Sequence, residues 1–233
     1  DLRAEVAALT GAVSGVLRIA CLPTFGRRYV MPALEALMAN HPELRVDLDL
    51  DERIADAVAG RVDVVLRVGH LEDSSLIATK LASHERRLVA SPHYLEQFGH
   101  PASLSALGNH RLLDKIHGAD LLGWSNLFEC KAGHLAGGQD VFRSDDFETL
   151  RNAALYGFGI ALLPSWVVGQ DIASGTLILL LPDLVDARGD AGGIYLLRAL
   201  ADAPAKVTAF TTSLRTVIGS PPIWDRGCDM RVA

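Results

Sequence analysis

The spacing of apolar and polar residues predicts a chain in which strands and helices alternate. An apolar run at Val16–Leu22 is typical of a buried strand, and the stretch after it places apolar residues at the spacing of one helix face, as far as Met38. A second strand, Arg45–Leu50, alternates charged and apolar residues, which predicts one solvated face and a place at the sheet edge. Strand–helix–strand order indicates an open parallel sheet, in which ligands bind at the carboxyl ends of strands. Thr24 and Phe25, which follow the first strand, therefore lie at a predicted binding edge.

An arginine interrupts the next apolar strand. Val62–Val68 is dense in valine, but Arg67 stands near its end, directly before Val68 and Gly69. A charge at this place must be paired or must face a wet cleft, because burying it alone costs too much free energy. An ion pair with an acid such as Asp63 or Asp73 and a position in a cleft both stay open.

The alternation of strands and helices continues to the end of the chain. The further predicted elements are a short helix capped by Asp51, strands at Leu76–Ala82 and Arg87–Ala90, a helix from Ser91-Pro92 to Gly99, a helix at Ser165–Ala173, strands at Leu177–Leu181 and Ile194–Leu197, and a helix at Ala203–Ile218. From His100 to Gly138 repeated glycines weaken the pattern and indicate a second lobe with antiparallel pieces. We expect the tail after Gly219 to be loosely held, with Ile223 and Trp224 as its candidates for packing onto the body.

The clearest unit of the second lobe surrounds a helix start. A strand runs into Ser144, and Asp145 and Glu148 have the spacing of a capping box. The helix is predicted to stop at Gly157, before a strand at Ile160–Leu163. The nearby glycines precede a strand and do not open a helix, so they indicate a turn and not a dinucleotide-binding loop.

Composition describes a folded chain and excludes several functions. The chain has 233 residues, of which 49% are hydrophobic and 21% charged, and this length suits one large domain or two lobes. No apolar run reaches the roughly 18 residues of a membrane span, and the start lacks the pattern of a signal peptide. A net charge of −6 argues against nucleic-acid binding by this chain alone.

Catalytic and metal-binding signatures are missing from the sequence. Cys21, Cys130 and Cys228 are odd in number and form no C-x-x-C pair, so we expect reduced thiols in a cytosolic protein, with a redox-sensing Cys130 as the minor alternative. There is no G-x-S-x-G elbow and no P-loop, and His84-Glu85 does not continue as a zinc-binding motif. We therefore predict no catalytic residue, no metal and no cofactor.

Several segments, taken together, resemble one family. They are VLRIACLPTFGRRYVMPAL, the HP before the second strand, GRVDVVLRVGHLEDSSLIATKL, ASPHYLEQFGHP, and GFGIALLP followed by G-x-L. In order and spacing, over roughly Gly15–Ile218, they closely resemble the effector-binding domain of LysR-type transcriptional regulators.

This resemblance implies an α/β fold of the periplasmic-binding-protein type, with two lobes, each a mixed sheet flanked by helices, joined by two crossover strands. Lobe I would comprise residues 16–85 and 200–220, and lobe II residues 86–199, followed by a tail at residues 221–233. Residues 1–15 would be the end of a linker helix. Family members carry a winged helix-turn-helix domain before that helix, so we expect DNA binding only from the full-length protein.

The family's effector cleft lies between the lobes, and the resemblance carries its positions onto this sequence. They are Pro23, Thr24 and Phe25 after the first strand, Arg67, Val68 and Gly69 after the third, and Ser144, Asp145 and Phe147 at the start of the lobe II helix. Two helix N-termini facing one cleft suit a carboxylate or another small polar acid. Asp145 and Asp146 would repel an anion unless Arg67 or Arg143 offsets them. A neutral effector, or a pocket made partly apolar by the two phenylalanines, is the alternative.

The resemblance also implies partners. Family members pair antiparallel, with the first helix of lobe I against the lobe II helix of the partner, which assigns Tyr29–Asn40 and Glu148–Tyr156 to a homodimer interface. The full-length protein would be a cytoplasmic homotetramer and not an enzyme. A periplasmic solute-binding receptor for a small organic acid is the competing function, and a two-lobed enzyme such as a dehydratase is the third. A signal peptide encoded upstream of Asp1 would favour the receptor, and a basic helix-turn-helix the regulator.

Overall fold

The computed structural model describes residues 13–51, 62–71, 75–116, 124, 139–182, 192–199 and 201–226. Several sequence predictions therefore lie outside the described residues, among them the linker helix over residues 1–12, the short helix after Asp51, and the state of Cys130 and Cys228. Residues 13 and 14 are not helical, and Gly15 already begins the first strand.

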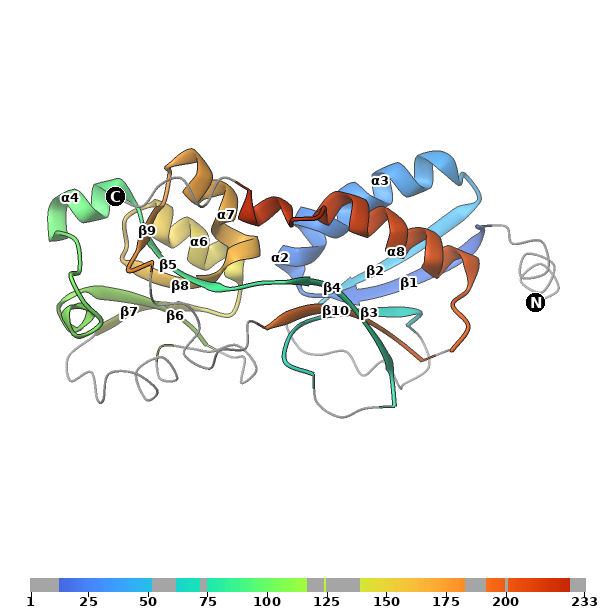
Figure 1. Ribbon diagram of the computed structural model, residues 1–233, viewed down its shortest axis with the longest axis horizontal. Coiled ribbons are helices and arrows are strands. Elements are labelled where there is room, and N and C mark those ends of the chain that lie inside the picture. Colours follow the sequence, from blue (N-terminus) through green and yellow to red (C-terminus); the bar gives the residue numbers. More distant parts are fainter. Residues whose placement is uncertain are drawn as a thin grey trace. The chain divides into compact units, whose positions relative to one another are not determined.

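The chain divides into two compact units, each with one five-stranded sheet flanked by helices (Figure 1). Unit 1 contains Asp1–Ser83 and Gly193–Ser220, and unit 2 contains His84–Gly192 and Pro221–Ala233. The predicted α/β architecture with two mixed sheets is confirmed.

The sheet of unit 1 has the strand order β2-β1-β3-β10-β4. Its strands are β1 (Gly15–Cys21), β2 (Leu44–Leu50), β3 (Val64–Gly69), β4 (Ile77–Ser83) and β10 (Gly193–Arg198). The first three are parallel, and β10 runs antiparallel between β3 and β4. The edge position predicted for the second strand is confirmed. Its charged side chains, Arg45, Asp47 and Asp49, are exposed as expected on a solvated face, and Leu50 at its end is exposed as well.

Two helices, α3 (Met31–Asn40) and α8 (Ala205–Ile218), lie together on one face of this sheet (Figure 1). The Ser213 hydroxyl on α8 donates a hydrogen bond of 2.7 Å to the carbonyl of Ala33 on α3. Apolar residues at helical spacing, such as Phe210 and Leu214, are fully buried, so burial of one helix face stabilises this layer. Before α3, the chain forms a short helix, α2 (Pro23–Phe25), and one wide helical turn, Gly26–Val30.

The sheet of unit 2 has the strand order β7-β6-β8-β5-β9. Its strands are β5 (Arg86–Ala90), β6 (Arg111–Lys115), β7 (Gln139–Ser144), β8 (Ile160–Pro164) and β9 (Ile178–Leu180). The helices are α4 (Pro92–Phe98), α6 (Phe147–Leu155) and α7 (Ser165–Ser174), with single turns at Ser105–Asn109 and at η4 (Ile223–Asp225). Strands β6, β7 and β8 are parallel, and β5 is antiparallel to both of its neighbours.

Local capping chemistry was predicted well for one helix and wrongly for another. Ser91 caps α4 by accepting a hydrogen bond from the Tyr94 N–H, and Pro92 follows in the first turn, as predicted. The capping box of Asp145 and Glu148 is wrong, because Asp146 is the N-cap of α6. Strand β7 ends at Ser144, whose hydroxyl accepts the Asp146 N–H at 3.1 Å, and this turn delays the helix by one residue.

The predicted lobe boundaries differ from the units in two places. Strand β10 lies within the range assigned to lobe II, residues 86–199, but it belongs to unit 1 because its backbone pairs with β3 and β4. The described part of the tail, residues 221–226, belongs to unit 2. Trp224 is 1% exposed there, so its expected packing onto the body is confirmed, and this part of the tail is not loosely held.

Candidate functional site

In unit 1, two of the predicted segments meet at the carboxyl edge of the sheet. Strands β1 and β3 are parallel neighbours, paired through Ile19 and Val64. The α2 residues, Pro23–Phe25, follow the carboxyl end of β1, and Arg67–Gly69 form the carboxyl end of β3. The sheet topology therefore brings these six predicted residues to one edge, where ligands bind in open α/β sheets.

Burial divides these six residues into two groups. Thr24 and Phe25 are 0% exposed, and Val68 and Gly69 are buried as well. The Phe25 ring packs against the Tyr29 ring at a centroid distance of 5.0 Å, so it belongs to the core of unit 1. Pro23 and Arg67 are half-buried and present side-chain surface at this edge.

Arg67 has a neighbour that the sequence did not reveal. Asp63, one of the two acids considered for it, accepts hydrogen bonds from Lys206 Nζ at 2.7 Å and from the Arg18 N–H at 2.8 Å. Asp73, the other acid, lies outside the described residues. Tyr195 on β10 stands opposite Arg67 in the antiparallel register. Because this pairing joins segments far apart in the sequence, only the sheet topology could identify Tyr195.

In unit 2, the remaining predicted residues surround the start of α6. Ser144 ends β7 and is half-buried, Asp145 is exposed, and Phe147 is the first residue of α6. Phe147 is 1% exposed, and its ring meets the Trp166 ring edge to face at 5.5 Å. Its ring is therefore part of the unit 2 core, as Phe25 is in unit 1.

The first turn of α6 already carries a carboxylate. Asp146 Oδ2 accepts hydrogen bonds from the Thr149 N–H at 2.9 Å and from the Thr149 hydroxyl at 2.7 Å. A carboxylate at a helix N-terminus interacts favourably with the helix dipole. With its own carboxylate already bound, this N-terminus attracts an anionic ligand less strongly.

Sequence reasoning missed Lys115, which lies beside these residues. It ends β6, pairs with Ser144 in the parallel register, and donates a hydrogen bond from Nζ to the Asp145 carbonyl. Its Nζ also lies 4.7 Å from the centroid of the Phe147 ring, in the range of a cation–π interaction. Lys115 could have been identified as a cation at the end of a strand parallel to β7. The hydrophobic pattern after His100 was too weak to predict that strand.

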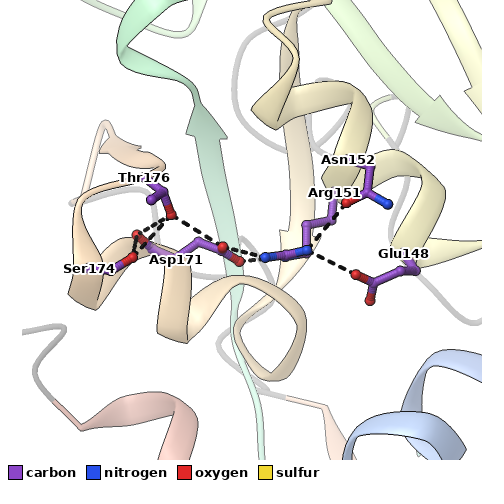
Figure 2. A network of polar contacts seen from close by, with 6 residues as sticks. All are labelled: Glu148, Arg151, Asn152, Asp171, Ser174 and Thr176. Carbon is purple, nitrogen blue, oxygen red and sulfur yellow. Dashed lines mark hydrogen bonds and ion pairs between the residues drawn. The ribbon is translucent and has the colours of Figure 1, made fainter.

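A polar network fixes α6 against α7 (Figure 2). Arg151 donates to both oxygens of Asp171, from Nε at 2.6 Å and from Nη2 at 2.5 Å, while its Nη1 binds Glu148 at 2.9 Å. The hydrogen bond to Asp171 is the main cause of a raised Arg151 pKa. The Asp171 carbonyl accepts hydrogen bonds from Ser174 and Thr176, which close the end of α7. The helix that follows the predicted effector residues is thus held by a bidentate ion pair.

A buried histidine in unit 2 forms a second polar cluster. The Tyr94 hydroxyl accepts the Arg111 N–H at 3.0 Å and lies 3.1 Å from His110 Nδ1. The hydroxyl can donate its own proton to the neutral His110 ring in the tautomer in which Nδ1 carries no proton. Burial lowers the His110 pKa below its ordinary value of 6.5.

This cluster predicts acid sensitivity. Well above pH 6.5, His110 is neutral in both the native and the unfolded state. As the pH falls, the unfolded state binds a proton first, because the native pKa is lowered. The free energy of unfolding therefore decreases with falling pH until the native His110 is protonated as well. We expect the wild-type free energy of unfolding in urea to drop between about pH 7.5 and about pH 5. His110→Asn, which keeps an acceptor for Tyr94 but cannot titrate, should reduce that drop. The exposed His93→Asn is the matched control, and equal pH slopes for His110→Asn and wild type would refute this assignment.

Cys21, at the end of β1, is a buried and unreactive thiol. It is 5% exposed, and burial, with a smaller contribution from the Asp49 charge, raises its pKa to about 12. Only the thiolate is a nucleophile, so this thiol is suited to packing and not to redox chemistry. Within the described residues, no cluster of three or more His, Cys, Asp or Glu side chains could bind a metal ion. Within the same residues, no helix has the length and apolar character that crossing a membrane requires.

Known proteins with similar sequences are transcriptional regulators. DmlR, an HTH-type transcriptional regulator of Escherichia coli (strain K12), is 34% identical over 197 residues, which are 83% of this chain and 63% of DmlR. The HTH-type transcriptional activator TtdR of the same strain is 35% identical over 178 residues, or 72% of this chain and 54% of TtdR. This chain therefore spans between about half and two thirds of the length of these relatives.

Solved structures agree with the sequences. CrgA from Neisseria meningitidis, a LysR-type transcriptional regulator, superposes with a TM-score of 0.77 at 26% identity, covering 93% of this chain and 73% of that structure. The profile of the family described as LysR substrate binding domain matches residues 10–218. These relatives are regulators and not enzymes or solute receptors, so neither alternative considered above is favoured. With nearly its whole length matched and both sheets in place, the chain belongs to the LysR substrate binding domain family.

Proposed function

We propose that this chain is the sensing part of a cytoplasmic LysR-type transcriptional regulator, which binds a small-molecule effector and thereby controls DNA binding by an N-terminal winged helix-turn-helix domain. The family match over residues 10–218 carries this proposal. It is supported by the relatives, whose names describe HTH-type regulators and activators. An effector acts by binding one conformation of the regulator more tightly than another, so it shifts the population between them.

The proposed effector site uses residues of both units. In unit 1 it comprises Pro23, Thr24, Phe25, Arg67, Val68 and Gly69, and in unit 2 Ser144, Asp145 and Phe147. Arg67 and Ser144 are half-buried, so they offer a cation and a hydroxyl to the effector, whereas the buried phenylalanines would support the walls. Arg67, with Lys115 near Ser144, favours a small organic acid over a cation.

The DNA-binding part of the proposal is tested with two proteins. The full-length regulator and this chain alone are compared for binding to the promoter regions next to the encoding gene, at one stated salt concentration. We expect retardation of DNA by the full-length protein only. Binding of equal strength by this acidic chain alone, or none by the full-length protein, would contradict the proposal.

We also propose that two copies pair antiparallel through α3 of one copy and α6 of the other, and that full-length chains form tetramers. The exposed apolar side chains on these two elements support this pairing. Met31 and Met38 on α3 are 52% and 42% exposed, and Tyr156, at the end of α6, is 73% exposed. Exposed apolar groups of this kind mark protein–protein contact surfaces when they cluster. Phe158 adds to the cluster, since its ring lies 6.2 Å from that of Tyr156.

Tyr156→Lys is expected to weaken dimerisation about tenfold or more, because a charge would replace an aromatic side chain at the proposed contact. Sedimentation equilibrium of this chain measures the effect. Phe98→Lys is the matched control: Phe98 is 39% exposed on α4, outside the proposed contact, and its replacement should leave the dimerisation constant unchanged. A wild-type chain that stays monomeric at high concentration would contradict the pairing.

A further inference from the structure

The chain passes between the two units at three places, although the family resemblance implied two. The expected crossings are from β4 to β5, at residues 83 and 84, and into β10, at residues 192 and 193. The third is at residues 220 and 221, where the segment after α8 leaves unit 1 and joins unit 2. The described part of this segment, Pro221–Arg226, is called the strap below.

Trp224 anchors the strap on α7. It lies in η4 and is 1% exposed. A methyl group added to Gly169 of α7 would lie 2.0 Å from the Trp224 carbonyl oxygen and 2.8 Å from its carbonyl carbon. The backbones of η4 and α7 therefore touch directly, and only a glycine at position 169 leaves room for this contact. Such a fit is typical of a docked segment and not of a loose tail.

The link between α8 and the anchor is short and stiff. Helix α8 ends at Ile218, and η4 begins at Ile223. Pro221 and Pro222 occupy half of the link, and the ring of proline restricts its backbone to a narrow range. The Asp225 N–H donates to the Pro222 carbonyl at 3.0 Å, and Arg226 reaches back to the Pro221 carbonyl at 3.4 Å. A link this short gives α8 little freedom once Trp224 is docked.

We propose that the strap restrains the movement of unit 1 against unit 2. The two strand crossings alone form a hinge, and separate domains are expected to move about such a hinge unless a further interaction opposes it. Docking of Trp224 on Gly169 adds that interaction, because the short link after α8 then ties unit 1 to a docked segment of unit 2. Displacing the strap frees the hinge without touching either sheet.

The anchor also lies close to the proposed effector site. Trp166 precedes Gly169 by three residues on α7, which places the two on neighbouring positions of the helix surface. The Trp166 ring contacts Phe147 at 5.5 Å, and Phe147 is one of the proposed effector residues. An effect of the strap on effector response rests on the proposed function, whereas the mechanical restraint does not.

The test measures the spread of distances between the units. Spin labels are attached to cysteines introduced at two exposed positions, Thr212→Cys on α8 and Gln97→Cys on α4. Cys130 and Cys228 are replaced by serine in every protein that contains them, so that they carry no label. Pulsed electron resonance gives the distribution of label distances. A chain ending at Ser220 and the variant Gly169→Ala should each widen this distribution about twofold relative to the intact chain. Gly26→Ala, whose added methyl group meets the far end of the Leu50 side chain and lies in neither labelled helix, should not widen it.

The widths of these distance distributions decide whether the strap restrains the two units. Equal widths in the intact and shortened chains would overturn the restraint. Should Gly169→Ala unfold, the shortened chain still gives the answer, and Trp224→Ser, which keeps the full length, gives it again. Unfolding of all three variants would also overturn the proposal, because the segment would then be an essential part of the unit 2 core. A wider distribution with no effector response in any variant would keep the restraint and contradict only the proposed function.

Discussion

Replacing Arg151 with methionine is expected to lower the free energy of unfolding by about 3 kcal/mol, because it leaves the Asp171 carboxylate buried without its cation. The side chain of Asp171 is 7% exposed, and that of Arg151 is 21% exposed. Both carboxylate oxygens of Asp171 bind the guanidinium, and a methionine can replace neither hydrogen bond (Figure 2). Urea unfolding of the variant and the wild type measures the difference.

Two further variants separate the ion pair from simple packing. Adding Asp171→Leu to Arg151→Met should recover part of the loss, because the buried charge is then gone as well. The matched control is Arg18→Met in unit 1, whose ion pair with Asp47 is 48% and 66% exposed and 3.4 Å long. An exposed pair contributes about 0.5 kcal/mol. An equal decrease in the free energy of unfolding for Arg151→Met and Arg18→Met would show that burial does not strengthen the Arg151–Asp171 ion pair.

Gly159→Ala is expected to destabilise the protein by about 2–3 kcal/mol, because the added methyl group would press on backbone atoms. It would lie 2.5 Å from the carbonyl oxygen of Arg111 and 3.0 Å from its carbonyl carbon. Arg111 begins β6, which pairs with β8 directly after Gly159, so neither strand can move away without losing sheet hydrogen bonds. Thermal and urea unfolding measure the loss.

Gly26→Ala is the matched control for this prediction. Its added methyl group would lie 2.4 Å from Leu50 Cδ2, the far end of a side chain that is 36% exposed. Leu50 can rotate into solvent, so the expected cost is under about 1 kcal/mol. A loss from Gly26→Ala that equals or exceeds that from Gly159→Ala would contradict the distinction between a rigid and a yielding neighbour.

Local patterns in the sequence predicted local structure. Ser91 followed by Pro92 identified the start of α4, because the hydroxyl and the missing N–H both act within one turn. Alternation of charged and apolar residues in Arg45–Leu50 indicated an edge strand, because a strand with one solvated face carries polar residues at every second position of its own sequence. The sequence predicted Asp145 as the helix cap, whereas Asp146 is the cap. Two adjacent aspartates have the same capping chemistry, so only the position at which β7 ends distinguishes them.

Pairing between distant segments could not be predicted in the same way. Strand β10 was placed in the wrong half, because its own residues do not reveal that β3 and β4 are its partners. The docking of Trp224 depends on space above Gly169, which no pattern in the tail records. For the candidate site, the sequence predicted which segments follow the strands, but neither the burial of Phe25 and Phe147 nor the presence of Lys115 at the same edge.

The most direct test of the central claim is ligand-induced thermal stabilisation of this chain, measured with a panel of small organic acids and their neutral amides. A ligand that binds only the folded chain raises the melting temperature in proportion to its affinity. We predict that at least one acid stabilises the wild type, and that Arg67→Gln in unit 1 and Ser144→Ala in unit 2 each abolish the shift. Thr212→Ala, on the exposed face of α8, should retain it. Stabilisation by none of the compounds, or a shift that survives the substitution in either unit, would contradict an effector site built from these residues.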